Sequence, residues 1–190
     1  NIAGGVNDTA IGTGARTVLV MGLNASFAEV TETVIMNGTT NVATVNSYVF
    51  ISRLVVLTAG SVQTNDGVIT ATAQTDGTIS ARIDVGFGQS SLCVHQVPAG
   101  KTAYMFKVYG SMNVGTTGAT ADIHLMTKAF GGAWIKRGSI GLSIDATSYG
   151  ERTFILPLPI TEKTLIKLQA DSDIANCDIS GGFDLVLVNN

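Results

Sequence analysis

The stretch Ser47-Tyr48-Val49-Phe50-Ile51-Ser52-Arg53-Leu54-Val55-Val56-Leu57-Thr58-Ala59 decides the fold of this chain. Its β-branched and aromatic residues favour an extended conformation. One face carries Val55 and Leu57, and the other carries Leu54 and Val56, so both faces are apolar. Strands that are covered on both sides have this composition. The stretch therefore predicts a central strand in a protein built from β-sheets.

The segments on either side of this stretch are also short and apolar, and most are bounded by Gly, Asn, Asp or Thr. Residues 17–23 are apolar on both faces, which indicates a second buried strand. Asn37-Gly38 follows another apolar segment and is a strong signal for a tight turn. About a dozen such segments, without a convincing helix, predict an all-β fold. We expect an antiparallel β-sandwich or a jelly-roll-like arrangement, built as one domain or as two consecutive β units.

Alternation within single segments predicts which side chains face the core. Residues 78–85 and 122–128 alternate between apolar and polar positions, as half-buried strands do. Asp122, His124 and Lys128 are then expected to face outward. The side chains expected to face inward are Ile79, Ala81, Ile83, Val85, Tyr104, Phe106, Val108, Ile123 and Leu125.

The chain divides by composition into three parts. Residues 1–15 are rich in Gly and poor in anchoring side chains, so they read as a flexible N-terminal arm that orders against a neighbour. Gly86-Phe87-Gly88 is the best candidate for an internal boundary. We therefore predict an N-terminal β unit over residues 16–86 and a C-terminal β-sandwich over residues 87–190.

The charge content limits the classes of partner. Only 13% of the residues are charged, against about 25% in a typical soluble domain, so we expect other copies or a partner to cover much of the surface. The net charge is −3, and the Lys and Arg residues do not cluster, which argues against nucleic acid as a partner. The longest apolar runs, such as Leu54 to Leu57, are far too short to cross a membrane.

No residue pattern predicts catalysis or a cofactor. Neither His95 nor His124 lies near a nucleophile motif, and Cys93 with His95 supplies only two ligands where a closed zinc site needs four. We expect Cys93 and Cys177 to be buried free thiols. The oxygen-rich run Asp171, Ser172, Asp173, Asn176 and Asp178 resembles a set of calcium ligands but lacks the EF-hand pattern, so a turn is the preferred interpretation.

The first half of the chain resembles virion proteins of tailed phages of the marine and cyanobacterial type. The segments that carry this resemblance are turns and strands, and they lie mostly within residues 13–112. They are Gly14-Ala15-Arg16-Thr17-Val18, Glu32-Thr33-Val34, Asn37-Gly38-Thr39-Thr40, Arg53 to Gly60, Asn65-Asp66-Gly67 and Val97 to Tyr104. The resemblance implies a β-sandwich structural protein on the outer surface of a particle, namely a capsid decoration (cement) protein made in the host cytoplasm.

This resemblance also implies a partner and an assembly. The partner would be the major capsid protein, and the protein itself would form a cyclic homo-oligomer, a dimer or a trimer. Within the arm, the candidate contacts with the capsid are Asn1, Ile2, Val6 and Ile11. The alternative is a head-fibre or tail-associated adhesin that binds host glycan through Trp134 and Tyr109. A third reading is a capsid shell subunit that assembles into closed shells.

Overall fold

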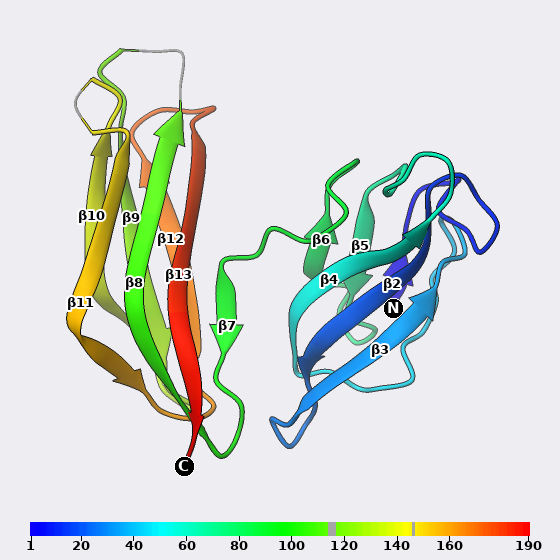
Figure 1. Cartoon of the computed structure of the whole chain (residues 1–190), viewed down its shortest axis with the longest axis horizontal. Helices are drawn as coiled ribbons and strands as arrows, with labels where there is room; N and C mark the ends of the chain where they lie inside the picture. Colours follow the sequence, from blue (N-terminus) through cyan, green and yellow to red (C-terminus); the bar gives the residue numbers. More distant parts are fainter. Residues whose placement is uncertain (114–116, 146) are drawn as a thin grey trace. The chain divides into compact units, whose positions relative to one another are not determined.

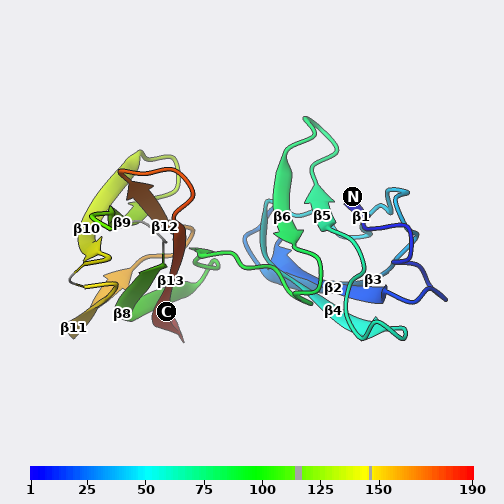
Figure 2. The same ribbon diagram turned by 90° about the horizontal axis from the view of Figure 1, so that it is seen from above.

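The structure, a computed structural model, describes residues 1–113, 117–145 and 147–190, which contain thirteen strands and no helix. The all-β prediction is therefore confirmed. The chain forms two compact units, residues 1–92 and residues 93–190. Each unit is a sandwich of two sheets with antiparallel pairing (Figure 1), and Figure 2 shows the two layers of each unit edge-on.

The boundary between the units lies after Leu92 and not at Gly86. The segment that follows Gly86 is still hydrogen-bonded to the first unit, because Val56 N donates to Gly88 O at 2.8 Å and Ser90 N donates to Leu54 O at 3.0 Å. Leu92 packs against the same core. The glycines at 86 and 88 both have positive φ and therefore mark a turn inside the first unit.

The first unit contains two three-stranded sheets. One has the order β1-β5-β6 and the other has the order β3-β2-β4. The strands are β1 (Ile2–Ala3), β2 (Ala15–Leu23), β3 (Glu29–Ile35), β4 (Phe50–Ala59), β5 (Ile69–Thr72) and β6 (Ile79–Ile83). The core between the two sheets includes Val18, Val20, Leu54, Ile69 and Ile83.

The central strand of the second of these sheets is β2, and not β4 as the sequence predicted. β2 pairs with β3 on one side and with β4 on the other. β4 is the last strand of this sheet, and three register shifts interrupt its ladder with β2. Its other side bonds to residues 88–90, and Leu57 on its outer face is half exposed. The inward prediction for residues 79–85 holds for Ala81 and Ile83, whereas Ile79 and Val85 at the two ends are exposed.

Residues 1–15 form part of the first sandwich, so the prediction of a flexible arm was wrong. Ile2 is buried in the core and pairs with Ala71 of β5. Asp8 is completely buried, and its carboxylate accepts four backbone hydrogen bonds of 2.7–3.0 Å, from Gly5 and Ala15 and from Asp66 and Gly67. Two stretches of chain far apart in the sequence are therefore joined through one carboxylate.

The second unit pairs a four-stranded sheet, β10-β9-β12-β7, with a three-stranded sheet, β11-β8-β13. Its strands are β7 (Val94–Gln96), β8 (Lys101–Asn113), β9 (Thr120–Lys128), β10 (Trp134–Ser143), β11 (Tyr149–Ile160), β12 (Leu165–Ser172) and β13 (Asp178–Asn189). In β9 the predicted alternation is confirmed: Ile123 and Leu125 are buried, whereas Asp122, His124 and Lys128 are not.

Candidate interaction surface

Six large apolar side chains are exposed together on the outer face and at one edge of the sheet β11-β8-β13. Ile155 is 98% exposed and Leu156 is 85% exposed, and the other four are each more than a third exposed. Water-exposed apolar groups gathered in one place usually mark a contact with another molecule. We call this set the apolar surface; it consists of Tyr104, Phe106, Ile155, Leu156, Val186 and Val188.

The strand registers place these side chains next to one another. Tyr104 of β8 lies directly opposite Val186 of β13 on one side and opposite Pro159 of β11 on the other. Val188 lies opposite Thr102, one step further along the same face. Directly opposite residues of an antiparallel pair point to the same face and are close enough for their side chains to touch. Tyr104, Val186 and Val188 therefore lie side by side, and Phe106, Ile155 and Leu156 lie at the neighbouring register irregularities of β8 and β11.

The sequence predicted that Tyr104 and Phe106 face the core together with Val108, and this prediction was wrong for the two aromatic residues. Met105 is buried, and Val108, three residues later, is buried on the same face. Both residues can face the core because β8 contains a bulge. The consecutive residues Asp184 and Leu185 of β13 lie opposite Lys107 and Met105, so Phe106 between them has no opposite residue in β13. Such a bulge reverses the alternation and leaves Tyr104 and Phe106 outside.

A larger irregularity in β11 exposes Ile155 and Leu156. Thr153 lies opposite Lys107 and Leu158 lies opposite Met105. Residues 154–157 of β11 therefore lie where β8 has a single residue, Phe106. Phe154 of this segment packs against the core, while the next two side chains point into water. No alternation in the sequence signals this segment, because its residues read as a plain apolar run.

The other half of the same sheet face is polar. The Lys107 ammonium forms an ion pair with the Glu151 carboxylate, and Tyr149 donates a hydrogen bond of 2.6 Å to the same carboxylate. The hydrogen bond from Lys107, and then that from Tyr149, hold the pKa of Glu151 below its ordinary value. Tyr109 lies beside this group, and its ring occupies the space above Gly182. The apolar surface therefore has a defined polar border.

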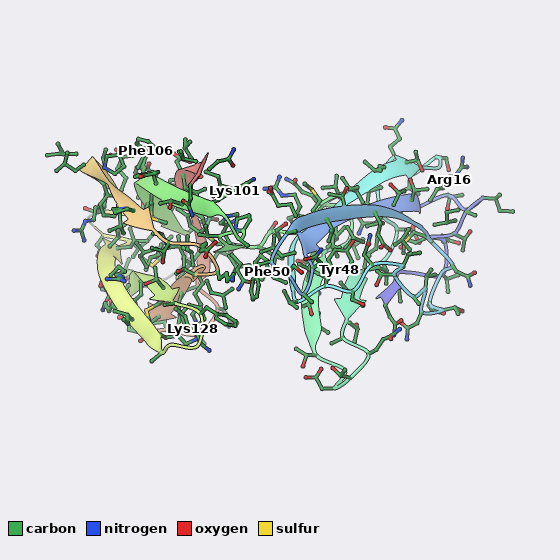
Figure 3. All side chains as sticks on the ribbon, turned by 90° about the horizontal axis from the view of Figure 1, so that it is seen from below. Arg16, Tyr48, Phe50, Lys101, Phe106 and Lys128 are labelled. Atoms are coloured by element: carbon green, nitrogen blue, oxygen red, sulfur yellow. The ribbon has the colours of Figure 1, made fainter. Side chains whose placement is uncertain are left out.

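The two aromatic residues considered for glycan binding lie on different sheets. Trp134 begins β10, in the four-stranded sheet, whereas Tyr109 belongs to β8, in the opposite sheet. Figure 3 shows the separation of the two outer faces, since Phe106 and Lys128 lie on opposite sides of the sandwich. The Lys167 ammonium lies 4.6 Å from the centre of the Trp134 ring. The structure thus does not bring Trp134 and Tyr109 together.

The four residues of the N-terminal segment have different environments. The amino group of Asn1 donates to Thr72 O, the side-chain amide of Gln74 donates to Asn1 Oδ1, and Ile2 is buried. Val6 and Ile11 are 75% and 91% exposed. Only the last two are open to a partner, and they are held on an ordered segment.

The groups considered for catalysis and metal binding are dispersed. His124 Nδ1 lies 3.2 Å from Ser139 Oγ on the outer face, and burial raises the pKa of the free Cys93 thiol to about 11. Asp173 lies in the connection between β12 and β13, and its carboxylate accepts two hydrogen bonds from Thr120 at the start of β9, rather than from the backbone of its own turn. Among the described residues, no three His, Cys, Asp or Glu side chains gather closely enough to hold a metal ion.

An open hollow of about 570 Å³ lies at one end of the four-stranded sheet. Asp122 and Asp171 line it and lie directly opposite each other on β9 and β12, and Gly141 lies opposite Asp122 on the other side. The hollow is lined by hydroxyl and carboxylate groups, among them the hydrogen-bonded pair Thr120 and Asp173.

None of the described segments forms a helix of the length and apolar character needed to cross a membrane. Comparison with protein-family models, with curated proteins and with solved structures found no match for this chain.

Proposed function

We propose that this protein is a structural component of a virion that decorates and stabilises a phage capsid, with the major capsid protein as its partner. The observation that carries the proposal is the apolar surface, a set of exposed side chains that a lone protein would keep in water at a cost. The low charge content and the resemblance of residues 13–112 to tailed-phage virion proteins support the same reading.

The apolar surface has the features of a protein contact. Its aromatic members, Tyr104 and Phe106, are of the type that contributes most to binding at interfaces. Its projecting members, Ile155 and Leu156, can enter a pocket of a partner, where each fully buried side chain contributes about 1.5–3 kcal/mol. A decoration protein that contacts two capsomers in this way adds buried area across their joint and so opposes their separation.

The glycan-binding alternative has less support. Sugar rings stack on open aromatic faces, whereas the face of Trp134 already has the Lys167 ammonium over it, and Tyr109 lies on the other sheet. The proposal therefore places the contact on the three-stranded sheet, and the test compares it with the N-terminal segment that the sequence suggested.

The test measures binding of purified protein to particles that lack it, by co-sedimentation. Replacing Ile155 and Leu156 together by Ser is expected to weaken binding at least about tenfold, because a loss of about 1.4 kcal/mol is sufficient for that. The matched control replaces the exposed Val6 and Ile11 by Ser and should bind normally. Cryo-EM of the decorated particle should place the density at capsomer joints.

Three results would contradict the proposal. Density confined to the tail or to a single vertex would favour the adhesin. Assembly of the pure protein into closed shells would favour a capsid subunit. Equal binding by both double variants and by the original protein would remove the apolar surface from the contact.

A further inference from the structure

The second unit has four edge strands, and three of them carry features that prevent pairing with another chain. β7 is only three residues long, and β10 carries Lys136 and Arg137 at a register shift. β11 carries Pro157 and Pro159 beside its four-residue irregularity. β13 has neither Pro nor Lys nor Arg over its twelve residues, although it lies at the edge of its sheet.

The free backbone groups of β13 can be identified from the ladder. Asn190 N donates to Gly100 O at 2.9 Å, so the backbone of Asn190 points toward β8. Backbone groups alternate in direction along an antiparallel strand, so Val186 and Val188 also point toward β8. The N–H and C=O groups of Leu185, Leu187 and Asn189 therefore point away from the sheet. Pro159 agrees with this pattern, because it lies opposite Tyr104, at a position where β11 donates no hydrogen bond to β8.

We propose that β13 pairs antiparallel with β13 of a second copy of this chain, about a two-fold axis at Val186. Leu185 then lies opposite Leu187 of the second copy, and these two residues exchange backbone hydrogen bonds. Val186 lies opposite its own counterpart at a position without hydrogen bonds, where side chains approach most closely. The two three-stranded sheets become one six-stranded sheet.

The register is restricted by symmetry and by charge. A two-fold axis perpendicular to the sheet keeps every side chain on its own face. Residues that lie opposite each other must therefore face the same way, so one residue at the axis lies opposite its own counterpart. An axis at Asp184 would bring two carboxylates together, which is unfavourable. The axis at Val186 instead places Asp184 opposite Val188 of the second copy. With this axis no like charges lie opposite each other, so the segment can pair with itself, and a second copy of this chain is the occupant that we propose for this edge.

This pairing also joins the two apolar surfaces. Val186 and Val188 border Tyr104 on one side and the axis on the other. A dimer consequently brings the Tyr104, Val186 and Val188 side chains of two copies together on one face of a continuous sheet. The inference goes beyond the capsid role and stands or fails separately, because it is tested on the purified protein alone.

The first experiment measures the mass of the full chain in solution by sedimentation and by light scattering. The monomer mass is 19.7 kDa, and we expect the protein to approach twice that mass at concentrations on the order of 200 µM. Val186→Lys brings two ammonium groups together at the axis and should weaken dimerisation at least tenfold. The matched variant Val188→Lys places its ammonium opposite Asp184 of the second copy, and its dimer should be at least as tight as the original.

The second experiment tests the register by disulfide formation in a protein whose Cys93 and Cys177 are replaced by Ala. Val186→Cys should form a cross-linked dimer under mild oxidation, because opposite residues at such positions have Cα atoms about 4.5 Å apart. Val188→Cys should not, since the two introduced thiols would be about 13 Å apart along the strands. A mixture of Asp184→Cys and Val188→Cys proteins should form a mixed dimer.

Several results would overturn the inference. A monomer at all concentrations would do so, as would a dimer that Val186→Lys and Val188→Lys affect equally. Efficient cross-linking of the Val188→Cys protein with itself would rule out the register. Circular dichroism checks that each variant remains folded, which is expected because Val186 and Val188 are both about half exposed.

Discussion

The buried carboxylate of Asp8 helps to hold residues 1–15 in the first sandwich, together with the pairing of Ile2 with β5. Asp8 is the only acceptor for four buried or partly buried backbone N–H groups in the hydrogen bonds described above. The sequence did not reveal this, because a lone Asp among glycines has the composition of a flexible segment. The small residues around it, such as Gly5 and Gly67, are needed because a Cβ at either would meet the backbone of the other.

Asp8→Ala is expected to lower the free energy of unfolding by at least about 3 kcal/mol, since each buried donor left without an acceptor costs about 1–3 kcal/mol. The measurement is denaturation by urea. Asp66→Ala is the matched control: Asp66 is exposed in the same turn and accepts a side-chain hydrogen bond from Asn7. Its effect should stay below about 1 kcal/mol. Equal effects would show that the carboxylate of Asp8 is not the essential link.

The raised pKa of the Cys93 thiol predicts how stability and the reactivity of this thiol depend on pH. Burial raises its pKa from 9.0 to about 11, against a smaller opposing effect of its contact with the Leu168 backbone. Any stability linked to this thiol is full below pH 9, and it is lost as the pH rises toward 11, because the unfolded chain releases the proton first. In a Cys177→Ser protein, the rate of alkylation by iodoacetamide should rise with an inflection near pH 11. An inflection near pH 9 in the folded protein would disprove the shift.

At the scale of the element, the sequence predicted the presence of the strands well, but it predicted less well which side chains of each strand face the core. The alternation in β9 was read correctly because that strand has no irregularity between Ala121 and Lys128 on its β12 side. The alternation in β8 was misread because one extra residue, Phe106, reverses it. Aromatic side chains on alternate positions fit an outer apolar face as well as a core, so the pattern alone could not distinguish the two.

The bulge can be tested by deletion. Removing Phe106 should leave Met105 and Val108 on the same inner face in a regular ladder, and we expect a change in stability of no more than about 1 kcal/mol. Removing Ser111 from the regular part of β8 should turn the buried Met112 outward and cost about 2–5 kcal/mol. Thermal unfolding of the two deletion variants provides the comparison. A more severe loss from deletion of Phe106 would contradict this account of the strand.

At the scale of the molecule, the sequence predicted two β units but placed their boundary six residues too early. Gly86 and Gly88 are typical of a linker, yet their backbone groups hold the last segment of the first sandwich to β4 and to Asn65. The connection between the units is correspondingly short, since Leu92 packs in the first core and Cys93 O accepts a hydrogen bond from Leu168 N in the second unit.

A fragment of residues 93–190 should fold by itself, because its core is formed within the unit. Its circular dichroism spectrum should be that of a β protein, with a single cooperative transition on heating. The Val186→Lys and Val188→Lys variants of the fragment should differ in mass as they do in the whole chain. A fragment that is unfolded at room temperature would show that the first unit is required for its stability.

The position of β13 also affects the order of events during synthesis. The first sandwich can be completed only after its later strands have been synthesised, since the amino group of Asn1 donates a hydrogen bond to Thr72 O, 71 residues later. The second sandwich receives β13 only after every other strand of its sheet has left the ribosome. The edge that we expect to join two copies is therefore the last part of this sheet to form during synthesis. Until β13 emerges, neighbouring chains on one message lack the strand through which we expect two copies to pair.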